Sequence, residues 1–324
     1  MAQKMTYTQA LNLSIKEEME RDDRIVLFGE DIGKPGGAFQ VTKGLWEQFG
    51  SDRVLDTPIS ETGFFGMAIG AALTGLRPVV EILYMDFCAV AMDQLINQAN
   101  KLTYMSGGQF PVPVVFRGQQ GAGRGNGAQH SQSFESLFCN MPGIQVVLPS
   151  SPNDAYGLFK TAVRNNKPVI FLEHKLLYGI RDEVEVGREP IPFGQANIVR
   201  SGEDVTIVAV SRMVQFAKEA AEKLAQQGIS CEIIDPRTLV PFDLETVAKS
   251  VQKTGRLIVV EESHRWGSIG ASIIHEVVEQ AFNYLDSPPK LIGTENVPIP
   301  YSKPLEDAAI PSPEKIEQAV LSMV

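Results

Sequence analysis

Short apolar strands alternate with helical segments through the first half of the sequence. The predicted strands are RIVLFGE (24–30), PVVEILY (78–84), PVPVVFRG (111–118), IQVVLPS (144–150) and PVIFLEH (168–174). Helices are predicted at Thr8 to Arg21, after Pro58, at Ala89 to Tyr104, and after Ser151, Pro152 and Asp154, which are typical of a helix start. Because the strands are apolar throughout and separated by helices, they predict a parallel sheet that is covered on both faces.

A second alternation follows a charged stretch with prolines at 179–197, which is predicted to be a linker. The predicted strands lie at 204–211, 230–237, 256–263 and 290–297, and the predicted helices at 214–227, 244–252, 270–283 and after Ser312 and Pro313. The sequence therefore predicts an α/β fold of two parallel-sheet domains, with residues 1–185 in the first and residues 186–324 in the second, smaller one.

The composition narrows the classes of function. Of the 324 residues 44% are hydrophobic and 21% charged, and no apolar run approaches the length of a membrane span. The net charge of -10 argues against a nucleic-acid surface and favours basic partners. The first residues resemble neither a signal nor a transit peptide, so we expect a cytoplasmic chain. Cys88, Cys139 and Cys231 lack metal-site or disulfide spacing and are expected to be buried thiols.

The stretch DTPISETGFFGMAIGAALTGLRP (56–78) places one acid, Glu61, at the predicted start of an apolar helix. Ser60 or Thr62 can cap this helix. A first-turn acid is often a solvated complement to the helix dipole. Here the apolar neighbours Ile59 and Phe64 favour a poorly solvated carboxylate that is suited to proton exchange with a ligand. The glycines spaced along the helix predict close packing of another backbone.

The sequence resembles, over essentially its whole length, the beta subunits of the thiamine-diphosphate-dependent decarboxylase component of 2-oxoacid dehydrogenase complexes, above all those of the pyruvate dehydrogenase type. The matching strings occur in the family's order in both halves of the chain. They are LFGEDIG (27–33), VTKGLWEQFG (41–50), DTPISETGF (56–64), YMSGGQFPVPVVFRG (104–118), AQHSQSFES (128–136) and VPIPYSKPLED (297–307). The resemblance implies a transketolase-like pyrimidine-binding domain followed by a transketolase C-terminal-like domain.

The resemblance also implies roles for three residues at the cofactor's pyrimidine ring. Glu61 matches the carboxylate beside one ring nitrogen, and Ile59 would contribute a main-chain contact to the ring. Phe87, in ILYMDFC (82–88), matches the aromatic side chain that packs on it, although a phenylalanine just past a strand is more often an ordinary core residue. We therefore expect Glu61 to be catalytic and all three residues to bind thiamine diphosphate.

One part of the family's cofactor site is missing from the chain. The superfamily holds the diphosphate and its magnesium with a GDG triplet and a later asparagine, and the nearest string here, Gly29-Glu30-Asp31, has the wrong order. The resemblance therefore implies half a cofactor site. A separate alpha subunit would supply the magnesium site, the diphosphate contacts and most of the substrate pocket, in a heterotetramer of two alpha and two beta chains.

The glycine-rich segment RGQQGAGRGNGAQHSQ (117–132) ends near His130. Its glycines do not fit GxGxxG, so a dinucleotide site is not indicated, and a plain surface loop remains an alternative. An imidazole at the end of this loop can exchange protons near neutral pH. His130 matches the family's active-site histidine, which implies a catalytic role in protonating intermediates or in acyl transfer to a lipoyl group.

Two further sites follow from the resemblance alone. Some family members bind potassium through main-chain carbonyls, and the matching positions are Val114, Ala162, Val163, Asn165 and Lys167. The lysine departs from the family pattern, and its charge disfavours a nearby cation. In the second domain Glu276, Glu279, Asp286 and the carboxylate of Val324 could face the acyltransferase core of the complex or form an ordinary solvated face.

The leading interpretation is therefore a subunit that, with its alpha partner, decarboxylates a 2-oxoacid oxidatively and passes the acyl group to lipoyl-lysine. Pyruvate is the expected substrate, and the acetoin and branched-chain 2-oxoacid enzymes are the alternatives within the family. A self-sufficient transketolase or deoxyxylulose-phosphate synthase would need a diphosphate-binding domain before this one. A non-catalytic flavin or nucleotide subunit of α/β type is a third possibility, and it predicts indifference to changes at Glu61.

Overall fold

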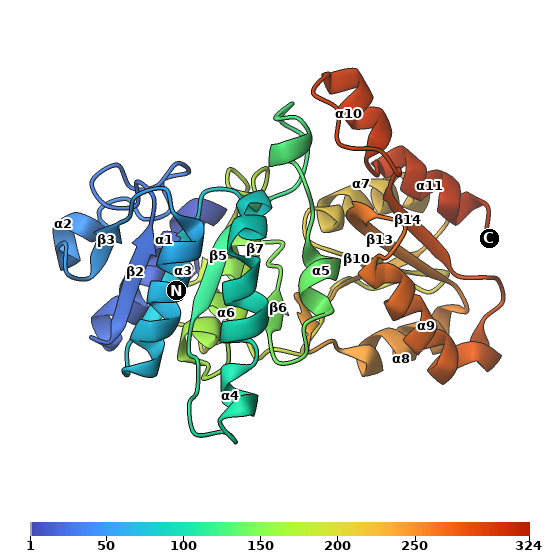
Figure 1. The fold of residues 1–324 in the computed structure, drawn as a ribbon. Helices are drawn as coiled ribbons and strands as arrows, with labels where there is room; N and C mark the ends of the chain where they lie inside the picture. The colour runs from blue at the N-terminus through green and yellow to red at the C-terminus, as the bar shows by residue number, and fades with distance from the viewer. Residues whose placement is uncertain (1) are drawn as a thin grey trace. The chain divides into compact units, whose positions relative to one another are not determined.

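The computed structural model describes residues 2–324, which form two compact units (Figure 1). The first unit holds the residues up to Gln120 together with Leu137–Phe193. The second holds Gly121–Ser136 and Gly194–Val324. Residues 121–136, the segment that contains His130, therefore pack with the second unit although they lie in the first half of the sequence.

The first unit is built on a parallel sheet, as the apolar strands predicted. Its strands lie in the order β6, β7, β5, β4, β2, β3. Their bounds are Gln145–Val147 (β6), Val169–His174 (β7), Val115–Gln120 (β5), Arg77–Ile82 (β4), Ile25–Gly29 (β2) and Val54–Asp56 (β3). Each of these neighbouring pairs is parallel, with Val79 opposite Val115 and Phe116 opposite Ile170. The carboxyl ends of the strands therefore share one edge of the sheet.

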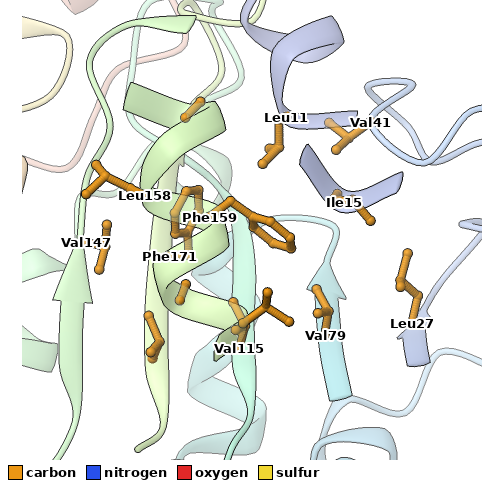
Figure 2. Close-up of a cluster of buried hydrophobic side chains, with 14 of the residues drawn as sticks. Leu11, Ile15, Leu27, Val41, Val79, Val115, Val147, Leu158, Phe159 and Phe171 are labelled. Atoms are coloured by element: carbon orange, nitrogen blue, oxygen red, sulfur yellow. The ribbon is translucent and has the colours of Figure 1, made fainter. Parts of the chain in front are cut away.

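Helices supply the other half of this unit's core. Their bounds are Tyr7–Arg21 (α1), Leu45–Phe49 (α2), Glu61–Leu73 (α3), Leu102–Met105 (α4), Glu135–Cys139 (α5, which spans the division between the units) and Pro152–Arg164 (α6). Figure 2 shows Leu11 and Ile15 of α1 and Leu158 and Phe159 of α6 directed at the strand residues, all of them buried. The predicted start of α6 is confirmed, because Ser151 accepts a hydrogen bond from the Asp154 amide.

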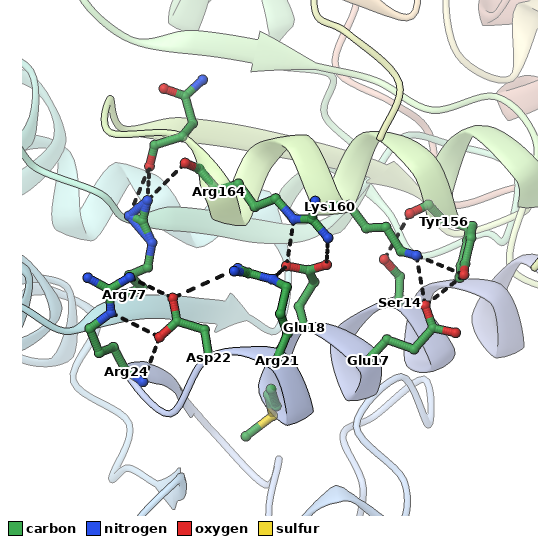
Figure 3. Close-up of polar contacts among 12 residues, drawn as sticks. Ser14, Glu17, Glu18, Arg21, Asp22, Arg24, Arg77, Tyr156, Lys160 and Arg164 are labelled. Carbon is green, nitrogen blue, oxygen red and sulfur yellow. Dashed lines mark hydrogen bonds and ion pairs between the residues drawn. The ribbon is translucent and has the colours of Figure 1, made fainter. Parts of the chain in front are cut away.

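Polar contacts join α1 to α6 along the side of this core (Figure 3). The Ser14 hydroxyl donates to the Tyr156 carbonyl at 2.8 Å, and the Arg164 guanidinium donates to Glu18 at 2.6 Å. Burial by itself raises the pKa of Glu18, but Arg164 and Arg21 hold it below its ordinary value. Asp22, one turn further on, binds the Arg24 guanidinium through both carboxylate oxygens at 2.9 and 2.8 Å.

Replacing Asp22 with asparagine should therefore lower stability in a pH-dependent way. The hydrogen bonds from Arg24 lower the pKa of Asp22 from 3.8 to about 2, so this stabilisation is complete above pH 3.8 and is lost as the pH falls through 2. Because Arg24 is exposed, we expect a loss of about 1 kcal/mol at pH 6. Urea unfolding at pH 6 and pH 3 measures it. The fully exposed Asp23 provides the control Asp23→Asn, and equal losses at both pH values would contradict the assignment.

Two segments of this unit differ from the sequence prediction. The prediction of a single helix from Ala89 to Tyr104 was wrong. The chain instead forms a 3₁₀ helix at Met85–Ala91 (η1), a π-helix at Gln94–Ala99 (η2) and then α4. Such departures from regular α-helix often occur at functional sites. The stretch 179–197 is not only a linker, because Arg181–Glu185 (β8) pairs antiparallel with Ala2–Thr6 (β1).

The second unit contains its own sheet, with strand order β14, β13, β10, β11, β9. The strands are Lys290–Thr294 (β14), Leu257–His264 (β13), Val205–Ala209 (β10), Cys231–Asp235 (β11) and Asn197–Arg200 (β9), with a short strand Thr238–Val240 (β12) outside this sheet. The pairs are parallel as predicted except β9, which runs antiparallel to β11. The helices are Met213–Ala225 (α7), Leu244–Thr254 (α8), Ile269–Ala281 (α9), Phe282–Tyr284 (the 3₁₀ helix η4), Lys303–Ala309 (α10) and Pro313–Leu321 (α11).

The predicted α/β fold with two sheets is thus confirmed. The first unit ends at Phe193, whereas the sequence places the boundary at 185, and the predicted boundary stays a prediction. Among the three thiols, Cys88 and Cys231 are buried as expected, whereas Cys139 is half-buried. Within residues 2–324 no helix combines the length and apolar character needed to cross a membrane.

Candidate active site

Glu61 is the first residue of α3 and lies near the edge where the strands of the first unit end. The preceding turn is held to β2, because the Thr57 amide donates to the Gly29 carbonyl at 2.9 Å. The carboxylate of Asp56 also accepts a hydrogen bond from the Gly33 amide at 2.7 Å. Ser60 occupies the N-cap position as predicted, but its side chain makes no capping hydrogen bond. The first-turn position of Glu61 is therefore fixed by contacts of the turn rather than by a side-chain cap.

Glu61 is buried, with 9% of its surface exposed, and its charge acts on a second acid, Glu30. Burial raises the pKa of Glu30, and the negative charges of Glu61 and Asp31 raise it further. The buried Oε1 of Glu30 has no hydrogen-bond partner among the described residues. The sequence analysis did not predict Glu30 as a site residue. It named Glu30 only within Gly29-Glu30-Asp31, the string nearest to the family's GDG triplet. The signal that could have found it is an acid directly after a buried strand, at the carboxyl edge of a parallel sheet.

Ile59 and Phe87 belong to the same unit as Glu61. The Thr62 hydroxyl donates to the Val90 carbonyl at 2.7 Å, which ties the first turn of α3 to the segment that carries Phe87. The Phe87 ring is half-buried and meets Tyr84 edge-on, with 6.0 Å between the ring centroids. Ile59 is 82% exposed. An exposed isoleucine beside a buried carboxylate leaves an apolar surface that this chain does not cover by itself.

The close packing of another backbone predicted for the glycines of α3 is not seen within the described chain and stays a prediction. A Cβ atom at Gly66 would meet the Gln94 side chain at 3.1 Å, and one at Gly70 would meet nothing within 4 Å. No other backbone of the described chain therefore packs against Gly70. Met67 and Leu73 of the same helix are exposed. The helix is apolar all round, but one side of it is open in the isolated chain.

Charged residues in three adjacent strands form a buried ionic cluster that the sequence reading missed. The strands were expected to be apolar throughout, but β4 carries Glu81, β5 Arg117 and β7 Glu173. Glu81 lies opposite Arg117 in the sheet register and pairs with it, and Arg117 binds both oxygens of Glu173 at 2.6 and 2.7 Å. Burial by itself lowers the pKa of Arg117, but Glu173 and Glu81 hold it well above its ordinary value.

The second unit contains the other predicted catalytic residue, His130. It ends the 3₁₀ helix Ala128–His130 (η3) and is half-buried. The preceding loop is closed at its base by a hydrogen bond of 2.9 Å from the Gly121 amide to the Gln132 carbonyl. Residues 121–127 therefore form a loop that belongs to the second unit, and η3 with His130 at its end follows directly.

Four of the positions predicted for potassium lie at or just after the carboxyl end of α6, and the fifth, Val114, directly precedes β5. The Ala162 carbonyl accepts a hydrogen bond from the Asn165 amide, and the Val114 carbonyl accepts one from the Val169 amide. The Asn165 carbonyl accepts from the Arg77 guanidinium, so a positive charge already lies at this helix end. Val163 is buried and Lys167 exposed. The potassium site stays a prediction.

The residues suggested for contact with an acyltransferase are on the surface of the second unit. Glu276, Glu279, Asp286 and Val324 are all exposed. His275 lies 3.6 Å from Glu279, and Arg256 lies 4.0 Å from Asp286. Basic side chains therefore accompany two of the acids, and their role in docking stays a prediction.

Comparison with known proteins assigns both parts of the chain. Residues 3–181 match the transketolase pyrimidine-binding domain, and residues 194–316 match the transketolase C-terminal domain. The pyruvate dehydrogenase E1 component subunit beta of Rickettsia bellii is 46% identical over 98% of this chain and 97% of its own length. The mitochondrial subunit beta-1 of Arabidopsis thaliana is 48% identical over 98% of this chain and 89% of its own.

A solved structure has the same fold at much lower sequence identity. The structure titled "Split gene transketolase, inactive beta4 tetramer" aligns with a TM-score of 0.80 at 22% identity, over 98% of both chains. Similarity at this level establishes the fold, and the curated relatives establish the family. The chain belongs to the family of pyruvate dehydrogenase E1 component beta subunits.

Proposed function

We propose that the chain is the beta subunit of a pyruvate dehydrogenase E1 component, which decarboxylates pyruvate oxidatively with an alpha subunit and transfers the acetyl group to lipoyl-lysine. The observation that carries the proposal is Glu61, a buried carboxylate at the first turn of α3 within a chain of this family. The names of the relatives favour pyruvate over acetoin or branched-chain 2-oxoacids.

The residues around Glu61 fit thiamine diphosphate as the shared cofactor. A buried carboxylate, an unpartnered oxygen of Glu30 and the exposed Ile59 together make a polar site with an open apolar border. When bound, the cofactor would supply the nucleophilic carbon and the electron sink that decarboxylation of a 2-oxoacid requires. The Glu61 carboxyl would hold a proton at a pyrimidine nitrogen, and Phe87 would pack on that ring.

Exposed apolar side chains at and before α3 also support the proposed alpha partner. Ile59, Met67 and Leu73 leave apolar surface around the start and along one side of α3, and a partner subunit would remove this surface from water. No cluster of His, Cys, Asp or Glu side chains in residues 2–324 is suited to hold a metal ion. We assign magnesium, the diphosphate contacts and most of the substrate pocket to the alpha subunit, in a heterotetramer of two alpha and two beta chains, because the sequence has no GDG triplet of the kind that holds the diphosphate in this superfamily.

His130 would exchange protons with the substrate or the lipoyl thiol from its place after the glycine-rich loop. Its half-buried position at the end of η3 leaves the imidazole accessible to another molecule. The exposed acids of the second unit would contact the acyltransferase core, and the location would be cytoplasmic.

Calorimetry with thiamine diphosphate and magnesium tests the division of the site. We expect the chain alone to show no tight binding and the complex with an alpha subunit to bind and to oxidise pyruvate. Tight binding by the chain alone would overturn the proposed division. Parallel assays with pyruvate, branched-chain 2-oxoacids and acetoin then identify the substrate, and a preference for acetoin would replace the pyruvate assignment.

A further inference from the structure

Two buried carboxylates hold the glycine-rich loop of residues 121–127, and neither belongs to a residue with an assigned role. Glu306 of α10 is fully buried, and its carboxylate accepts hydrogen bonds from the Gly123 amide at 2.7 Å and from the Gly125 amide at 3.1 and 3.2 Å. Glu262 of β13 is also buried and accepts a hydrogen bond from the Ala122 amide. Three amides of one short loop are thus bound by side chains from two distant elements.

The loop sequence is suited to this arrangement. Gly123 and Gly125 have φ values of 107° and 65°, a region that residues with side chains rarely adopt. Successive amides in turns of this kind can point into one concavity and bind an anion. Here the chain supplies the anion itself, as the Glu306 carboxylate. The alternation of glycine with other residues from 121 to 127 therefore matches a loop that must wrap a carboxylate.

Burial of the two carboxylates is unfavourable unless hydrogen bonds compensate for the lost water. The Arg212 guanidinium lies 3.7 Å from Glu262 and offsets part of that negative charge. Glu306 is satisfied by neutral backbone amides, which give strong, directional hydrogen bonds to an ionised acceptor. The hydrogen bonds that compensate for the burial of Glu306 exist only while the loop holds this conformation. Burial of the carboxylate and the conformation of the loop therefore depend on each other.

We propose that Glu306, assisted by Glu262, is a positioning residue that fixes the loop of residues 121–127 and through it the place of His130. The part of this inference that concerns His130 rests on the proposed function. The part that concerns the hydrogen bonds from the loop to Glu306 does not. Because η3, which ends at His130, begins directly after the loop, a loop released from Glu306 would present the imidazole in many orientations. A misplaced proton donor is expected to lose much of its catalytic effect.

Hydrogen exchange of the assembled enzyme tests the holding of the loop without reference to activity. In the Glu306→Gln variant the amides of Gly123 and Gly125 should exchange about 10-fold faster or more, because a charged acceptor is replaced by a neutral one. Asp307→Asn, the same change at an exposed neighbour, should leave both rates unchanged. Unchanged exchange in Glu306→Gln would overturn the proposal. If that variant does not fold, Glu262→Gln provides the same test at the Ala122 amide.

A double-variant cycle tests whether Glu306 acts through His130. Glu306→Gln should lower the rate of pyruvate-dependent lipoyl acetylation about 10-fold or more while thiamine diphosphate affinity is unchanged. Added to His130→Ala, it should cause little further loss, since a residue that only positions His130 has no effect once the imidazole is gone. Multiplicative losses would overturn the positioning role. Full activity of His130→Ala would instead overturn the role proposed for His130, and the exchange rates would still report on the loop.

Discussion

Replacing Glu61 with glutamine should lower the rate of pyruvate oxidation by about 10²–10⁴-fold, the range typical of a lost general acid or base. Glutamine keeps the volume and one acceptor oxygen of the side chain, so the fold of α3 should not change. It cannot carry out the proton exchange proposed for the Glu61 carboxyl. The measurement is the steady-state rate of the complex with an alpha subunit, together with thiamine diphosphate affinity by calorimetry. We expect the main loss in kcat.

Glu47 provides the matched control, since it is an exposed acid in the first turn of α2. Glu47→Gln should retain the wild-type rate. If Glu61→Gln also retained full activity with the alpha subunit, Glu61 would be no more than a first-turn acid that complements the helix dipole. The non-catalytic α/β subunit would then be the better interpretation of this chain.

Replacing Arg117 with methionine should reduce the free energy of unfolding by about 3–5 kcal/mol, because it leaves buried carboxylates without their counterion. The pKa of Glu81 is already raised by burial, and Arg117 opposes that rise. Without Arg117, the carboxylates of Glu81 and Glu173 must bind protons or be reached by water. Either change lowers the free energy of unfolding. Urea unfolding followed by circular dichroism measures the loss.

Two comparisons isolate the effect of the buried charge. Arg181→Met removes an exposed arginine on β8 and should change stability by less than about 0.5 kcal/mol. Adding Glu173→Gln to Arg117→Met should recover part of the loss, since the carboxylate that Arg117 bound on both oxygens is removed. A loss of under about 1 kcal/mol in Arg117→Met would show that the cluster is solvated in solution rather than buried.

Local sequence signals predicted much of the fold correctly because they depend on nearby residues. The start of α6 follows from Ser151, Pro152 and Asp154, whose capping bond spans only a few positions. The parallel sheets follow from short apolar strands separated by helices. The segment from Met85 to Met105 was less predictable. Its 3₁₀ and π turns have no distinct periodicity in the sequence, and a single apolar helix was the simpler prediction.

The sequence by itself determined the family, the alternation of elements and the place of Glu61 at the start of a helix. Only the tertiary structure showed which distant residues meet. Glu81, Arg117 and Glu173 look like isolated charges in apolar strands until the sheet register brings them together. Glu306 lies 183 positions from Gly123 in the sequence, yet its carboxylate accepts a hydrogen bond from the Gly123 amide. Local propensity carries no information on such pairings, because they depend on how the whole unit folds and excludes water.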